Sequence, residues 1–166
     1  MFGFLAVIGF VLFLMMQGSA APDITAQALT TRDRAATLMT AANEQRKHFN
    51  TNKMTSTNAT LAAALNSMNT SLSELAGGKN AKNKNKSAVA KEQAYSGALS
   101  KKLNDAYLAG TLDRTYATQM AYELRIFKSM IQKMRKTSKA DAVVAFYDEN
   151  IPTIDATIKQ LSEFTE

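Results

Sequence analysis

Apolar side chains recur every three or four positions along most of the chain, which is the spacing of one helix face. A first stripe starts near Ile24, and Gln45 fills the one polar gap in it. Its other members are Ala28, Thr31, Ala35, Leu38, Ala42 and Phe49. A second stripe has the same spacing and consists of Leu61, Leu65, Met68, Leu72 and Leu75. Because residues 50–58 between them are rich in Asn, Thr and Ser, residues 24–76 form either two antiparallel helices or one interrupted rod.

Three more helices are predicted beyond a polar segment. Residues 77–87 begin with two glycines and continue with alternating Lys and Asn, so we expect a mobile loop there. Helices then follow from about Ser87, Leu112 and Ala140. Their apolar faces are Tyr95, Leu99, Leu103, Ala106 and Tyr107; Tyr116, Met120, Leu124, Phe127, Ile131 and Met134; and Val143, Phe146, Ile151, Ile154, Ile158 and Leu161. Pro152 is expected to interrupt and kink the last helix, since proline lacks the amide hydrogen.

The first 22 residues follow a different pattern, because they contain no charged side chain. The segment predicted to enter a membrane or an assembly is defined by twelve large apolar residues. These are Phe2, Phe4, Leu5, Val7, Ile8, Phe10, Val11, Leu12, Phe13, Leu14, Met15 and Met16. Such a run exposes too much apolar area for a soluble surface, so we expect a bilayer, a translocon or a filament to bury it.

Three interpretations of residues 1–21 remain open. Small residues at 18–20 before Ala21 favour a cleaved signal peptide, although no basic residue precedes the apolar core. A membrane helix needs about 20 apolar residues, and this segment barely reaches that length. The segment also weakly resembles the hydrophobic stem of type IV pilins, with a proline at position 22 but Leu5 where those pilins usually carry glutamate.

Composition favours a single all-α domain over residues 22–166. The chain of 166 residues has no cysteine, no tryptophan and only two prolines. The lack of cysteine excludes disulfides, thiolate metal sites and thiol nucleophiles, so packing alone has to stabilise the fold. The abundant Ala, Leu, Met, Lys and Gln are good helix formers.

The last two predicted helices carry a recognisable pattern. Residues 112–116 read Leu-Asp-Arg-Thr-Tyr, Met120 follows, and residues 150–154 read Asn-Ile-Pro-Thr-Ile. The residues of this pattern used for comparison are Asp113, Arg114, Tyr116, Met120, Phe146 and Pro152. Over residues 113–158 the chain resembles a bacterial family of exported, ferritin-like helical proteins described as predicted outer-membrane proteins of unknown function.

The resemblance implies an antiparallel ferritin-like four-helix bundle behind the hydrophobic N-terminal helix. The family tends to carry histidines where this chain has Leu124 and Thr157, so any role of those histidines is not transferred, and Leu124 is predicted to be core. We expect Asp113 to cap its own helix. Tyr116 is expected to pack its ring and place its hydroxyl at the rim of the core.

No pattern of catalytic or metal-binding residues is present, so we predict neither an enzyme nor a bound cofactor. The single histidine, His48, has one nearby acidic residue, Glu44, and we interpret the two as a surface pair. A ferritin-type di-iron site needs several inward carboxylates and Glu-x-x-His pairs. The other glutamates of interest are scattered over four predicted helical segments, where only tertiary packing would bring them together. They are Glu74, Glu92, Glu123 and Glu149.

The net charge of +6 lies outside the apolar start. It is concentrated in residues 79–86 and in Arg125, Lys128, Lys133, Arg135, Lys136 and Lys139. Such surfaces usually serve solubility, but they also fit an anionic envelope polymer or lipid. Since no aromatic residues alternate with these lysines, nucleic acid is not expected as a partner.

The sequence therefore predicts an exported cell-envelope bundle with a structural or interaction role. Its location would be periplasmic, membrane-tethered through residues 2–21, or on a surface filament. The alternatives are a pilin-like filament subunit that assembles with like subunits through residues 1–49, and a ferritin-like metal-binding protein.

Overall fold

The chain folds into a bundle of five α-helices. The computed structural model describes residues 23–78, 81–82 and 85–164. The helices are α2 (Ile24–Gln45), α3 (Asn52–Leu75), α4 (Lys86–Leu108), α5 (Leu112–Thr137) and α6 (Asp141–Ser162). The all-α prediction is confirmed, but the predicted number of four bundled helices is wrong. The predicted apolar segment, residues 1–21, lies outside the described residues, and no helix within the described part is long and apolar enough to cross a membrane.

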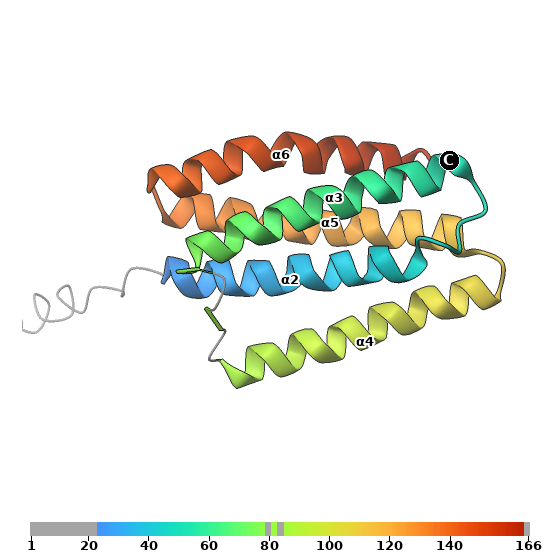
Figure 1. Cartoon of the computed structure of the whole chain (residues 1–166), viewed down its shortest axis with the longest axis horizontal. Helices are drawn as coiled ribbons and strands as arrows, with labels where there is room; N and C mark the ends of the chain where they lie inside the picture. Colours follow the sequence, from blue (N-terminus) through green and yellow to red (C-terminus); the bar gives the residue numbers. More distant parts are fainter. Residues whose placement is uncertain (1–22, 79–80, 83–84, 165–166) are drawn as a thin grey trace, which may run out of the picture.

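Four of these helices form a ring in which each contacts two neighbours (Figure 1). Helix α2 packs against α3 and α5, and α6 packs against the same two helices from the opposite side. Neighbours in the ring run antiparallel, as the bonds from Thr137 to Gln27 and from Lys53 to Glu163 illustrate. Helices α3 and α5 consequently run in the same direction, so the chain has to travel back along the bundle between them.

Helix α4 makes this return on the outside of the ring. It packs against α2 and α5 and runs parallel to α2 (Figure 1). Its buried residues, Leu99, Leu103 and Ala106, face the bundle. The sequence pattern recognised α4 as a helix but did not show that it lies outside a ring completed by the other four.

The helix ends follow from local sequence. Asp23 begins α2 by accepting a hydrogen bond from the Thr25 amide at 2.9 Å, and Thr51 and Asn85 cap α3 and α4 in the same manner. At the end of α3, Gly77 has a φ of 96°, which lets the Gly77 and Gly78 amides bond back to the last turn. The predicted glycine terminator of α3 is thereby confirmed.

The predicted stripes form most of the core, but the prediction for Tyr107 of the α4 stripe is wrong, because its side chain is 43% exposed at the end of that outer helix. The α5 stripe is buried along its whole length, with Tyr116 and Phe127 as its largest members. In α2, Gln45 is buried together with its apolar neighbours, and Leu124 lies in the core as predicted. Because the chain turns between Gln45 and Asn52, residues 24–76 form an antiparallel hairpin and not a rod.

Two local predictions need correction. Helix α6 runs through Pro152 without ending there. The proline lies on the exposed side of α6, where water can satisfy the carbonyl that has lost its donor. The loop predicted at residues 77–87 also extends too far, since Lys86 and Ser87 already belong to α4.

Candidate functional site

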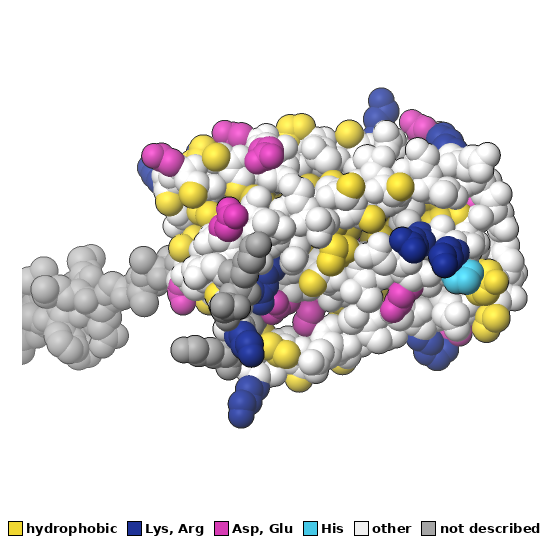
Figure 2. Space-filling model, viewed as in Figure 1, with side chains coloured by type: hydrophobic (Ala, Val, Ile, Leu, Met, Phe, Trp, Pro, Cys, Tyr) yellow, Lys and Arg dark blue, Asp and Glu magenta, His cyan; other side chains and the backbone are white. Residues whose placement is uncertain are grey.

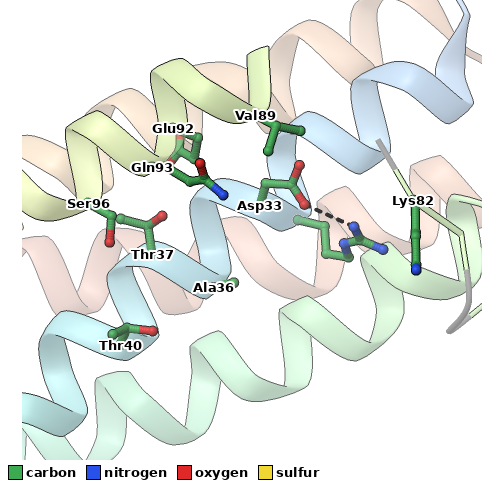
Figure 3. A pocket seen from close by; sticks show the side chains of 10 residues that line it. Asp33, Ala36, Thr37, Thr40, Lys82, Val89, Glu92, Gln93 and Ser96 are labelled. Atoms are coloured by element: carbon green, nitrogen blue, oxygen red, sulfur yellow. Dashed lines mark hydrogen bonds and ion pairs between the residues drawn. The ribbon is translucent and has the colours of Figure 1, made fainter. Parts of the chain in front are cut away.

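A groove lined by both polar and apolar side chains runs between α2 and α4 (Figure 3). It has a volume of about 460 Å³. Asp33, Thr37 and Thr40 line it from α2, while Glu92, Gln93 and Ser96 line it from α4 and Lys82 from the preceding loop. Arg32 lies at one end, where its guanidinium pairs with Asp33 at 2.9 Å and donates to the Ala81 carbonyl at 2.7 Å.

An ionic cluster that shares Glu92 with this groove joins α2, α4 and α5. The Arg34 guanidinium donates to both carboxylate oxygens of Glu92, at 2.8 and 3.0 Å, and pairs with Glu123 at 3.4 Å. Its central carbon lies 3.9 Å from the centre of the Tyr95 ring. Glu123 is only 1% exposed, and its other oxygen accepts a 2.6 Å bond from Gln119. A buried carboxylate is therefore balanced by one cation and one amide.

The surroundings shift the pKa of two members of this cluster. Burial by itself lowers the pKa of Arg34, but the hydrogen bonds and charge of Glu92 outweigh it, and the net shift is upward. Burial raises the pKa of Tyr95, and the nearby Glu123 carboxylate raises it further. The Tyr95 hydroxyl lies in the field of Glu123 without making a hydrogen bond of normal geometry. Arg34 and Tyr95 thus stay protonated and hold the three helices together.

The cluster brings together two of the four glutamates that the sequence left scattered. Glu92 and Glu123 converge, but the group between them is the Arg34 guanidinium. Within the described residues, no three His, Asp or Glu side chains lie close enough together to hold a metal ion. The donor set of this site therefore fits a structural ion cluster.

A second buried polar network crosses the core between α3 and α5. The Tyr116 hydroxyl donates to the Asn58 side-chain oxygen, and the Asn58 amide donates to the Ala42 carbonyl at 3.0 Å. Tyr116 is fully buried, which raises its pKa. The expected rim position of its hydroxyl is wrong, because Asn58 supplies a buried acceptor.

The prediction that Asp113 caps its own helix is wrong. Its carboxylate instead binds the turn between α2 and α3. Its carboxylate accepts bonds from the Asn50 amide at 3.0 Å and from the Thr51 amide and hydroxyl at 3.1 and 2.9 Å. Thr51 in turn caps α3 by accepting from the Met54 amide. Asp113 therefore fastens the start of α3 to the start of α5.

The other predicted residues are spread over the bundle. Met120 and Phe146 are core residues, whereas Arg114 and Pro152 are exposed. The apolar residues from Phe2 to Met16 lie outside the described part of the chain.

The predicted surface pair of His48 and Glu44 has other partners. The His48 ring contacts the Tyr107 ring at a tilt of 48°, with centroids 4.3 Å apart. Glu44 accepts a 2.7 Å bond from the Ser100 hydroxyl of α4. Both contacts attach the far end of α4 to the α2 side of the bundle.

Sequence reasoning missed Arg34 and Asn58, although a signal for this kind of site was present. Glu123 lies seven residues after Tyr116 and four before Phe127, which places a carboxylate on the apolar face of α5. Asn58 likewise lies between Met54 and the stripe that starts at Leu61. A polar residue at an apolar position predicts a buried partner, but its identity depends on how the helices pack.

No family model, curated protein or solved structure matches the chain. The resemblance of residues 113–158 to exported ferritin-like proteins and that of residues 1–22 to pilin stems therefore stay predictions.

Proposed function

We propose that this protein is a non-enzymatic helical bundle of the cell envelope with a structural or interaction role, and that residues 2–21 tether it to a membrane. The junction between the two parts carries the proposal. Asp23 has an extended backbone and caps α2, so the bundle begins with its own helix start directly after the uncharged apolar sequence. The core of the described part is built from residues between Ala28 and Leu161.

The use made of the charged and polar groups supports a structural role. Glu92 and Glu123 hold Arg34, Asp113 holds the α2–α3 turn, and Glu44 bonds to α4. In each case the carboxylate fixes one helix to another. Groups that are satisfied in this way are poorly placed to act as acids, bases or metal ligands.

The ferritin-like character of the bundle is also a proposal. Its ring has two antiparallel hairpins, α2–α3 and α5–α6, joined by one long return along the bundle (Figure 1). Ferritin-like folds likewise have one long crossover between helix pairs. This topology supports the resemblance over residues 113–158 and leaves the metal-binding alternative without an observation in its favour.

The filament alternative requires α2 to serve as an assembly helix. Helix α2 contacts α3, α4 and α5, and its apolar stripe is buried against them. That stripe is occupied within one molecule, which favours the tethered bundle over a stem made of residues 1–49.

Cell fractionation combined with intact-mass measurement tests the proposal. We expect the full-length chain in the membrane fraction, released by detergent but not by high salt. A chain that begins at Ala21 in a soluble fraction would replace the tether with a cleaved signal peptide. Full-length monomer dissolved in cytosol would contradict an envelope role altogether.

A further inference from the structure

The two basic segments of the sequence meet at one end of the bundle. Lys82 and Asp23 line one pocket beside the first turn of α2, and Lys133 lines another groove beside Ala26 and Gln27. The Thr137 hydroxyl also bonds to Gln27 at 3.2 Å, so the end of α5 lies against the start of α2. The α2 start, where the uncharged sequence joins the bundle, is therefore flanked by lysines from both sides. We call this end the N-terminal end of the bundle.

Charge is distributed unevenly along the bundle. If each helix is divided at its midpoint, the described half nearer the N-terminal end has eleven basic and seven acidic residues. The other described half has seven basic and six acidic residues. The excess positive charge therefore lies mainly in the half that adjoins the apolar sequence.

Within the N-terminal end, the charges also separate by side. The acidic residues Glu74 and Asp141 belong to the last turn of α3 and the first turn of α6. On the face shown in Figure 2, several acidic side chains lie over α3 and α6, while basic side chains gather near the start of α4. The acidic residues on the side formed by α2, α4 and the end of α5 are Asp23, which caps α2, and Asp33 and Glu92, which pair with Arg32 and Arg34, so the unpaired charge on this side is mainly basic.

Helix stability explains only part of this basic side, because the dipole of α5 favours Lys136 in its last turn. Lys86 is the first residue of α4, where the helix dipole disfavours a cation, and the first turn of α4 contains no acidic residue. Lys133, Lys136 and Lys139 are exposed. The ion pairs within the described residues use Arg32, Arg34, Lys53, Lys101 and Lys128, and thus none of the lysines just named.

We propose that Lys82, Lys86, Lys133, Lys136 and Lys139 form a docking surface for the anionic head groups of the bilayer that holds the apolar segment. The inference rests on the proposed tether, which brings this end of the bundle to the membrane surface. Each lysine near an anionic bilayer strengthens binding about fivefold. In this arrangement the basic side of the bundle contacts the lipid head groups. The acidic side, formed by α3 and α6, faces away from the bilayer.

Site-specific fluorescence in vesicles tests the docking surface. The chain has no cysteine, so a single introduced cysteine is labelled uniquely. Ala140→Cys marks the N-terminal end and Ala109→Cys marks the opposite end, and both positions are exposed. Full-length labelled protein is reconstituted in neutral vesicles or in vesicles containing phosphatidylglycerol, with an acceptor dye on the head groups. We expect higher energy transfer from position 140, but not from position 109, in the anionic vesicles, and its loss in 0.5 M salt.

A matched pair of triple variants identifies the residues. Both variants remove three exposed charges, but from opposite ends of the bundle. The first is Lys133→Gln, Lys136→Gln and Lys139→Gln, and the control is Arg46→Gln, Lys47→Gln and Arg114→Gln. The first should lower the ratio of docked to undocked bundle about 100-fold, and the control should leave it unchanged. Equal energy transfer in the two kinds of vesicle, or full retention in the first variant, would overturn the proposal.

Flotation of the same samples separates this inference from the tether. Flotation with neutral and anionic vesicles alike supports the tether, whatever the energy transfer shows. Flotation that occurs only with anionic vesicles and is lost in salt would contradict the tether but support the docking surface. Flotation with both kinds of vesicle, with the same energy transfer from position 140 in each, would support the tether and contradict the docking surface.

Discussion

Helices α4 and α5 are similar in length and pack against each other, yet different interactions hold them in the bundle. Ten residues of α5 are buried, whereas α4 buries only Leu99, Leu103 and Ala106, all in its second half. The first half of α4 is attached through Glu92 and Tyr95 to Arg34 of α2. Apolar burial thus fixes α5 in the core, while an ionic cluster fixes the position of α4 on its outside.

The difference teaches that the fold has two levels of stability. The ring of α2, α3, α5 and α6 encloses most of the core, so it should open only when the whole bundle unfolds. Helix α4, with few buried apolar contacts, should open locally at a lower free energy. The groove between α2 and α4 lies at this weaker interface.

A matched pair of leucine truncations should give the largest effect. Leu124→Ala in α5 removes a side chain from the centre of the ring, and we expect a loss of about 3–5 kcal/mol in the free energy of unfolding. Leu99→Ala in α4 should cost about 2 kcal/mol, the low end for this substitution, because the outer helix can adjust over the gap. Urea unfolding measures both. Equal losses would mean that α4 belongs to the core as fully as α5.

Removing the cation of the ionic cluster should have the next largest effect. Arg34→Leu leaves the buried Glu123 carboxylate without its charge partner, and we expect a loss of about 2–3 kcal/mol, since Arg34 itself is partly exposed. Hydrogen exchange should accelerate in the first half of α4 more than in α3. The exposed Arg114→Leu is the control and should change neither quantity. Unchanged exchange in α4 would show that the cluster does not hold this helix.

The smallest effect concerns how the free energy of unfolding of the four-helix ring depends on pH. Because burial raises the pKa of Tyr116, the folded state keeps the phenol proton at pH values where the unfolded chain loses it. This contribution is constant below about pH 10, the ordinary tyrosine pKa, and falls above it by about 1.4 kcal/mol per pH unit.

Urea unfolding between pH 9 and 11 checks this dependence. Tyr116→Phe should reduce the slope of unfolding free energy against pH, while Phe at the exposed Tyr122 should keep the parent slope. An unaltered slope in Tyr116→Phe would contradict the burial of this hydroxyl.

The sequence by itself determined the helices and most of what they bury. Spacing of three and four identified the inner faces of α2, α3, α5 and α6, because only residues on one side of a helix reach the same core. Gly77 marked the end of α3, since it adopts a positive φ that a local sequence rule anticipates. The uncharged first 22 residues were equally plain from composition.

Only the tertiary structure decided which helix lies outside and which polar groups meet. Helical spacing gives the direction of a face but not the neighbour that covers it, so the outer position of α4 could not be read from its stripe. Arg34 and Glu123 are 89 residues apart, and Asp113 bonds to Thr51 across 62 residues. The partner of a buried charge is set by the packing of whole helices, and no local pattern contains that information.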